Sequence, residues 1–167
     1  TCALPISFTA ENNSPERVFL VAPLPGDELI VQYETKRAPE ESGDFVISRV
    51  NHDFTGILKY TDKRRPMGTP AGACNQDIQC NTSPGLKNVR NSVCRIMVLG
   101  TDLCTGTLVN NTLQDGKPYV LTANHCIDTT LKAPASLFLF NYESPYCGAL
   151  DGDVTNSLSG NKLKAHL

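Results

Sequence analysis

Two segments of the chain carry residue types whose spacing suits acid–base chemistry. Residues 104–109 read Cys-Thr-Gly-Thr-Leu-Val, and residues 120–126 read Val-Leu-Thr-Ala-Asn-His-Cys. A histidine side chain has an ordinary pKa of about 6.5, so it can accept and return a proton near neutral pH. His125 is therefore a candidate general base, provided that its ring is held rigidly.

The two segments have the form of a hairpin that could supply this rigidity. Asp115 and Gly116 lie between them and predict a turn that joins two strands. Cys104 and Cys126 then stand at the outer ends of the hairpin, where antiparallel pairing would bring them close. A disulfide between them would be worth about 3 kcal/mol in the chain-entropy model, and it would fix the backbone beside His125.

Other roles are open to the same residues. An isolated histidine is usually structural, and we interpret His52 and His166 in that way because no motif surrounds them. The cysteines could instead bind zinc together with His125. We expect no metal site, because adjacent His125 and Cys126 cannot easily converge on one ion.

The elements around the hairpin predict an all-β protein. Short apolar runs recur between Gly, Pro, Asn and Asp, and helical periodicity is not visible. We expect strands at 17–22, 28–34, 45–51, 94–99, 104–110, 118–123 and 136–142, with another beginning at 162–167. Residues 61–92 are rich in Pro and Gly and are predicted to be a linker and loop. We therefore divide the chain into a β-rich segment, 1–66, and a second β unit, 67–167.

Composition excludes several classes of function. The 167 residues carry a formal net charge of -2, and no basic stripe indicates a nucleic-acid surface. No apolar run approaches the ~20 residues of a membrane helix. The seven cysteines include no Cys-x-x-Cys pair, and their wide spacing favours disulfides in an oxidising compartment. Their odd number leaves at least one without a partner in this chain.

Several motifs of the chain resemble the trypsin/chymotrypsin clan of serine endopeptidases. The two hairpin segments are similar to that clan's Cys-x-Gly-Ser-Leu-Ile strand and its Leu-Thr-Ala-Ala-His-Cys segment. The closer resemblance is to bacterial lysyl-endopeptidase-like secreted proteases, which show Gly-x-Cys-Asn-x-x-x-x-Cys, Cys-Thr-Gly-Ser-Leu-Val-Asn-Asn-Thr and Phe-Asn-Tyr-x-Ser-x-x-Cys segments. These correspond to residues 72–80, 104–112 and 140–147, with Thr107 in place of Ser.

The resemblance implies a fold and a set of covalent links. Residues 67–167 would form most of the first barrel of a chymotrypsin-like double β-barrel, and residues 1–66 would be the end of a zymogen's pro-region. The implied disulfides are Cys104–Cys126 and Cys80–Cys147. Cys74 would pair with a cysteine outside this chain, while Cys2 and Cys94 are left unassigned.

The resemblance also implies a role for His125 as the general base of peptide hydrolysis. The protein would be secreted and bacterial, with the periplasm and the cell surface as alternatives, and it would act on proteins or peptides without a cofactor. No Gly-Asp-Ser-Gly-like nucleophile segment occurs, and neither Asp151 nor Asp153 matches a catalytic position. We expect the chain to be the front part of the enzyme, inactive without the missing C-terminal half. Similarity suggests a preference for basic residues, which nothing in this chain tests.

The sequence leaves alternatives for the function of the chain and for its basic segment. The chain could be a non-catalytic, secreted adhesion or binding module that keeps a protease-like scaffold. A stop codon directly after Leu167 would favour that alternative, whereas Gly-Asp-Ser-Gly further on would favour the protease. Lys63, Arg64 and Arg65 could be a processing site or a solvated charged loop.

Overall fold

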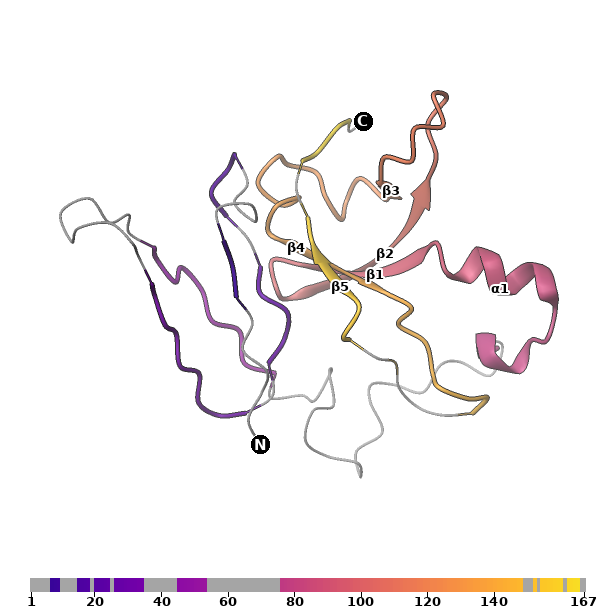
Figure 1. The fold of residues 1–167 in the computed structure, drawn as a ribbon, viewed down its shortest axis with the longest axis horizontal. Helices are drawn as coiled ribbons and strands as arrows, with labels where there is room; N and C mark the ends of the chain where they lie inside the picture. The colour runs from indigo at the N-terminus through magenta and orange to yellow at the C-terminus, as the bar shows by residue number, and fades with distance from the viewer. Residues whose placement is uncertain are drawn as a thin grey trace.

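An antiparallel sheet of five strands organises the second half of the chain (Figure 1). The computed structural model describes residues 7–9, 15–18, 20–24, 26–34, 45–53, 76–148, 152, 154–160 and 162–165. The elements are η3 (Ile78–Cys80), α1 (Pro84–Arg90), β1 (Val93–Val98), β2 (Asp102–Val109), β3 (Tyr119–Thr122), β4 (Ser136–Phe140) and β5 (Ser157–Ser159). None of the described helices is long and apolar enough to span a membrane. The fold is mostly β, as expected.

The strands follow the order β3-β2-β1-β4-β5, so β1 lies at the centre of the sheet. It pairs with β2 from Val93↔Thr107 to Val98↔Asp102, and with β4 from Cys94↔Phe140 to Val98↔Ser136. β3 and β5 are the two edges. Within the described residues the sheet is open, and it does not close into a barrel.

Both faces of β1 contribute to the core, since side chains alternate across a strand. One face forms a core cluster of Cys94, Ile96 and Val98 with Cys126, Ile127 and Ala133. The opposite face forms a second cluster of Met97, Leu137 and Leu139, against which Leu20, Ala22, Tyr142 and Val154 pack. The central strand therefore links the two core clusters.

Gly106 allows β1, β2 and β3 to approach closely. A Cβ atom at this position would lie 2.7 Å from Cγ1 of Val120 and 2.8 Å from Cδ1 of Ile96. Both distances are shorter than real Cβ contacts, so a side chain would displace the side chains of Val120 and Ile96 that pack over this position. Glycine therefore gives these side chains the room to pack beneath the strand pair that carries the candidate site.

The connection between β2 and β3 is longer than the tight turn expected from Asp115 and Gly116. β-pairing ends at Val109↔Tyr119. The carboxylate of Asp115 accepts hydrogen bonds from Asn111 Nδ2 at 2.7 Å and from the Lys117 amide at 3.1 Å. The pKa of Asp115 is lowered, first by its side-chain contact with Lys117 and next by that residue's amide. The predicted hairpin exists, but a polar side-chain network shapes its loop.

α1 corrects the prediction that residues 61–92 are only linker and loop. Pro84 occupies the beginning of the helix, where its missing N–H is tolerated, and Ser83 is the N-cap residue. Lys87 and Arg90 stand in the last turn, where positive charge is favourable. Seven residues are too few to show helical periodicity, and Pro84 with Gly85 has the composition of a turn.

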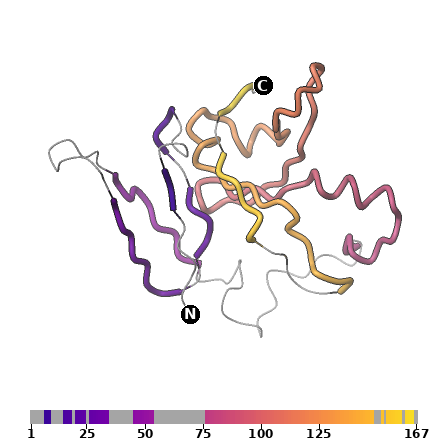
Figure 2. The backbone as a smooth tube through the Cα atoms, in the orientation of Figure 1, coloured from indigo at the N-terminus to yellow at the C-terminus, as the bar shows by residue number. Residues whose placement is uncertain are grey.

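The N-terminal strands are a second correction. The described residues in 17–22, 28–34 and 45–51 form no β-strand. Their apolar side chains are largely exposed, the large ones being Val18, Val21, Leu29, Ile30, Val31, Tyr33, Phe45, Val46, Ile47 and Val50. Figure 2 shows these residues as extended segments that run beside the sheet, without joining it. A strand pattern without a paired neighbour and a covered face does not produce a stable strand.

Hydrogen bonds connect described N-terminal residues to the second half of the chain. Ser159 Oγ donates to the carbonyl oxygen of Leu20 at 2.8 Å. Asn51 Nδ2 donates to the carbonyl oxygen of Leu99 at 3.0 Å, at the turn between β1 and β2. Together with the packing of Leu20 and Ala22, these contacts hold part of the segment against one face.

The C-terminal strand is a third correction. Residues 162–165 form no strand, and the last strand in the described part of the chain is β5, which pairs with β4 from Leu137↔Ser159 to Leu139↔Ser157. β5 was not predicted, because it is a short edge strand whose single apolar residue, Leu158, is exposed.

Candidate active site

His125 lies in a turn directly after β3, beside the buried core. Its side chain is exposed, whereas the next two residues, Cys126 and Ile127, are buried in the first core cluster. The amide of Cys126 donates to the carbonyl oxygen of Ala123 at 3.0 Å, which closes the turn. The sequence thus anchors the residues that follow the histidine and leaves its imidazole in contact with solvent.

The turn is tied to β2 by a disulfide and a hydrogen bond. Cys104 and Cys126 form a disulfide with their Cα atoms 6.3 Å apart and a sequence separation of 22 residues. Thr122 Oγ1 donates to the carbonyl oxygen of Thr105 at 2.8 Å. A crosslink of this loop length stabilises a fold by about 3 kcal/mol in the chain-entropy model. The backbone on both sides of the imidazole is therefore held to the sheet.

His125 and the two cysteines converge more closely than expected. One imidazole nitrogen and the sulfurs of Cys104 and Cys126 all lie within 4.8 Å of one another. The expectation was that adjacent His125 and Cys126 do not easily converge on one ion, yet the turn places the imidazole close to both sulfurs. The disulfide explains instead why this cluster is no thiolate metal site in its oxidised form, since both sulfurs are bonded to each other.

A second disulfide, Cys80–Cys147, anchors the segment that precedes α1. Both disulfides match the pairs that the family resemblance implies. Beside this one, Asp77 accepts hydrogen bonds from the amides of Gln79 and Gly148 and from Ser144 Oγ, each at 2.9 Å. These bonds lower the pKa of Asp77, with the Gln79 amide first, the Gly148 amide next and the Ser144 hydroxyl third. The sequence analysis missed this carboxylate, although an Asp two residues before an amide donor is typical of an Asx turn.

Cys94 is the free cysteine among the described residues. Its side chain is only 1% exposed and lies in the same core cluster as Cys126. Burial raises the pKa of this thiol, while a hydrogen bond with the Gly106 backbone acts in the opposite direction. A buried, protonated thiol is a poor nucleophile, so Cys94 behaves as a small apolar core residue.

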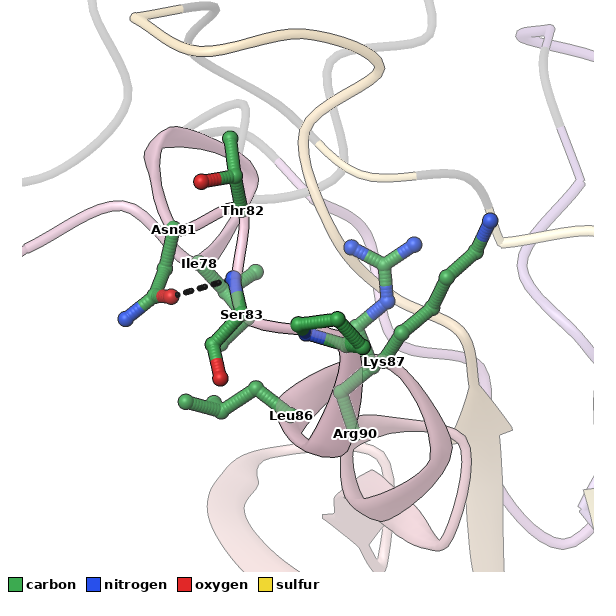
Figure 3. Close-up of a pocket in the computed structure, with 8 residues that line it drawn as sticks. Ile78, Asn81, Thr82, Ser83, Leu86, Lys87 and Arg90 are labelled. Carbon is green, nitrogen blue, oxygen red and sulfur yellow. Dashed lines mark hydrogen bonds between the residues drawn. The ribbon is translucent and has the colours of Figure 1, made fainter.

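A pocket of about 250 Å³ lies beside η3 and α1 (Figure 3). It is lined by Ile78, Asn81, Thr82, Ser83, Pro84, Leu86, Lys87 and Arg90. The Arg90 guanidinium is already engaged, with Nε 3.4 Å from Glu143 Oε2 and Nη1 donating to Gln79 Oε1 at 3.2 Å. The lining contains no histidine, cysteine or carboxylate, so this pocket offers no general base.

The remaining site predictions concern residues outside the described part of the chain. These are Cys2, Lys63, Arg64, Arg65, Cys74, Asp151, Asp153 and His166. Among the described residues, no hydrogen bond joins the His125 imidazole to a carboxylate. The described site therefore contains an exposed imidazole on a backbone that the disulfide holds to the sheet, without an orienting acid bonded to it.

Comparison with known proteins identifies the family. The described residues are mostly β, with two disulfides and an exposed histidine after a strand. Residues 69–167, more than half of the chain, match the model of the family described as lysyl endopeptidase, C-terminal domain. The chain belongs to this family, and the predicted resemblance to lysyl endopeptidases is confirmed.

Proposed function

We propose that the chain is part of a secreted serine endopeptidase in which His125 is the general base. The observation that carries this proposal is the exposed imidazole beside the Cys104–Cys126 disulfide, in a chain of the lysyl endopeptidase family. A general base needs solvent or substrate access and a fixed position, and the turn after β3 exposes His125 and holds its backbone, while an orienting acid would have to fix its ring.

In this mechanism His125 handles one proton twice. Its imidazole accepts the proton of a serine hydroxyl as that oxygen attacks the peptide carbonyl, and then delivers it to the leaving amine. An acid would hold the imidazole in the required tautomer, and backbone amides would bind the oxyanion. We propose that the acid, the serine and the oxyanion site come from the other half of the same enzyme.

The proposed architecture assigns the general base to this chain and the acid, the serine and the oxyanion site to the other half of the enzyme. Residues 67–167 would belong to the first barrel of a chymotrypsin-like double barrel, and the five-stranded sheet would be most of it. Residues 1–66 would be the end of a pro-region, with Leu20 and Asn51 among its contacts to the sheet. The isolated 167-residue chain should lack peptidase activity, because it contains no Gly-Asp-Ser-Gly-like segment.

The compartment is part of the proposal. Two disulfides and the family fit an extracellular protein. A bacterial source, and secretion into the periplasm or to the cell surface, would agree with the lysyl endopeptidases. The substrate would be a protein or peptide, and neither nucleic acid nor membrane is expected as a partner.

Peptide hydrolysis by the full-length enzyme tests the assignment of His125. We expect His125→Ala to lower kcat/KM by about 10⁴-fold or more, as for other catalytic histidines that act within a triad. His52→Ala is a matched control, because His52 is also exposed. Activity of His125→Ala within tenfold of the unchanged enzyme would rule out its role as general base. Labelling of the isolated chain by a serine-directed phosphonate, above the His125→Ala background, would contradict the proposed inactivity of this chain.

A further inference from the structure

The cluster of Cys104, His125 and Cys126 contains the donor atoms of a soft metal site. One imidazole nitrogen and two sulfurs lie within 4.8 Å of one another, on the solvent side of the first core cluster. Two thiolates and one imidazole form a ligand set that binds zinc with good affinity, and hard cations such as Mg²⁺ do not prefer it. The sulfurs can act as such ligands only after the disulfide between them is broken.

We propose that reduction of the Cys104–Cys126 disulfide converts this cluster into a site for one Zn²⁺ ion. A phosphine or dithiol reductant supplies two electrons, and two protons from solvent complete the two thiols while the reductant is oxidised. Zn²⁺ then displaces both thiol protons and binds the two sulfurs and the His125 nitrogen. Water takes the fourth position of the tetrahedral site. This inference does not depend on the proposed peptidase function.

The sheet keeps the two cysteines close without the covalent bond. β2 and β3 pair from Gly106↔Thr122 to Val109↔Tyr119, directly beside the disulfide. The hydrogen bond from Thr122 Oγ1 to Thr105 adds a further tie. Ile127, buried next to Cys126, holds the end of the turn in the core. The ligands are therefore gathered before the metal arrives, which lowers the entropy that metal binding must overcome.

The position of His125 gives the ion a path of entry. Cys126 is buried and Cys104 is half-buried, whereas His125 is exposed. An ion from solvent meets the imidazole first, and the sulfurs then bind it from the side of the protein. The second disulfide, Cys80–Cys147, is not part of such a group, since the described residues place no histidine with it.

A zinc titration of the reduced full chain tests this site. The reductant is removed before the titration, and oxygen is excluded so that the disulfide does not form again. The probes are Zn²⁺ alone and Co²⁺ as its spectroscopic substitute, with Mg²⁺ as a negative control. Cys104→Ala/Cys126→Ala and Cys80→Ala/Cys147→Ala each lose two cysteines, so they keep equal numbers of other thiols. His125→Ala is compared with His52→Ala, because each variant loses one exposed histidine.

We expect one equivalent of Zn²⁺ to bind to the reduced chain and to Cys80→Ala/Cys147→Ala. Cys104→Ala/Cys126→Ala should lose this equivalent, and His125→Ala should weaken it by at least about tenfold, because loss of even an outer-shell partner costs ten- to a hundredfold. The Co²⁺ complex should show thiolate-to-metal charge transfer, and its spectrum should change in His125→Ala but not in His52→Ala. Equal binding by the two double variants would overturn the proposal. Equal zinc affinity of His125→Ala and the unchanged chain would also overturn it. So would the absence of zinc binding because the reduced chain unfolds.

Discussion

The sheet and the N-terminal residues both contain runs of aliphatic side chains, but they bury them very differently. Ile96 in β1 is fully buried between β2 and β4, whereas Ile30 in the N-terminal part is 84% exposed. Pairing on both flanks and packing on both faces therefore determine burial here, and residue type alone does not. The candidate base lies on the packed region, at the end of β3 and beside its core.

Matched isoleucine substitutions should give the largest difference between the two regions. Ile96→Ala removes a fully buried side chain and should lower the free energy of unfolding by about 2–5 kcal/mol, because it leaves a cavity between the strands. Ile30→Ala should change it by no more than about 0.5 kcal/mol. Chemical denaturation of both variants checks this, and a comparable loss in Ile30→Ala would show that the N-terminal residues are packed in solution.

Matched glycine substitutions should give a somewhat smaller effect. Gly106→Ala places a Cβ against Val120 and Ile96, so it should destabilise the fold by about 1–3 kcal/mol. Gly85→Ala in α1 has nothing within 4 Å of the new Cβ, and it should stabilise by up to about 1 kcal/mol. Thermal unfolding of the two variants measures the difference. Equal melting temperatures would mean that the sheet is less tightly packed than described.

Leucine substitutions within the N-terminal part sharpen the comparison. Leu20 packs on Met97, Leu137 and Leu139, so Leu20→Ala should destabilise the sheet by about 1 kcal/mol, the value for partial burial of a leucine. Leu29 is exposed, and Leu29→Ala should have no measurable effect. Hydrogen exchange of the β4 amides provides a local readout. Unchanged protection in Leu20→Ala would indicate that the segment does not contact the sheet in solution.

The effect of Asp77 should appear as a dependence of stability on pH. Its folded pKa lies below the ordinary carboxyl value, so its contribution is present above about pH 4 and is lost as pH falls through the folded pKa. Asp77→Asn should therefore differ from the unchanged protein near neutral pH, and the difference should shrink as the solution is acidified. Denaturation curves at several pH values measure it. A difference that does not depend on pH would mean that the charge of Asp77 does not stabilise the fold.

Much of the sheet could be predicted from the sequence, because its strands are apolar runs bounded by turn residues. The predicted 94–99 and 136–142 overlap β1 and β4 closely. α1 and β5 could not be predicted in this way, since one begins with Pro84-Gly85 and the other has one exposed apolar residue. The prediction of N-terminal strands was wrong, because an alternating pattern forms a strand only where a neighbouring strand pairs with it and other residues cover its apolar face.

The same limits apply to the candidate site. The local motif was sufficient to predict that His125 follows a strand and lies beside a disulfide. The convergence of its ring on both sulfurs depends on the turn after Thr122, which residue spacing does not reveal. For Asp77 only the local turn with Gln79 could have been predicted, because its other partners, Ser144 and Gly148, are distant in sequence. The catalytic role of His125 stays a prediction, which the peptide hydrolysis experiment tests.

The central claim is that one disulfide fastens an exposed imidazole to the packed sheet, and peptide mapping of the non-reduced protein tests it most directly. We predict one linked pair of peptides that contains Cys104 and Cys126, another that contains Cys80 and Cys147, and a Cys94 thiol that reacts only after denaturation. A linked pair that joins Cys94 to Cys104 or to Cys126 would contradict the account, because the turn that carries His125 would then be held in a different way.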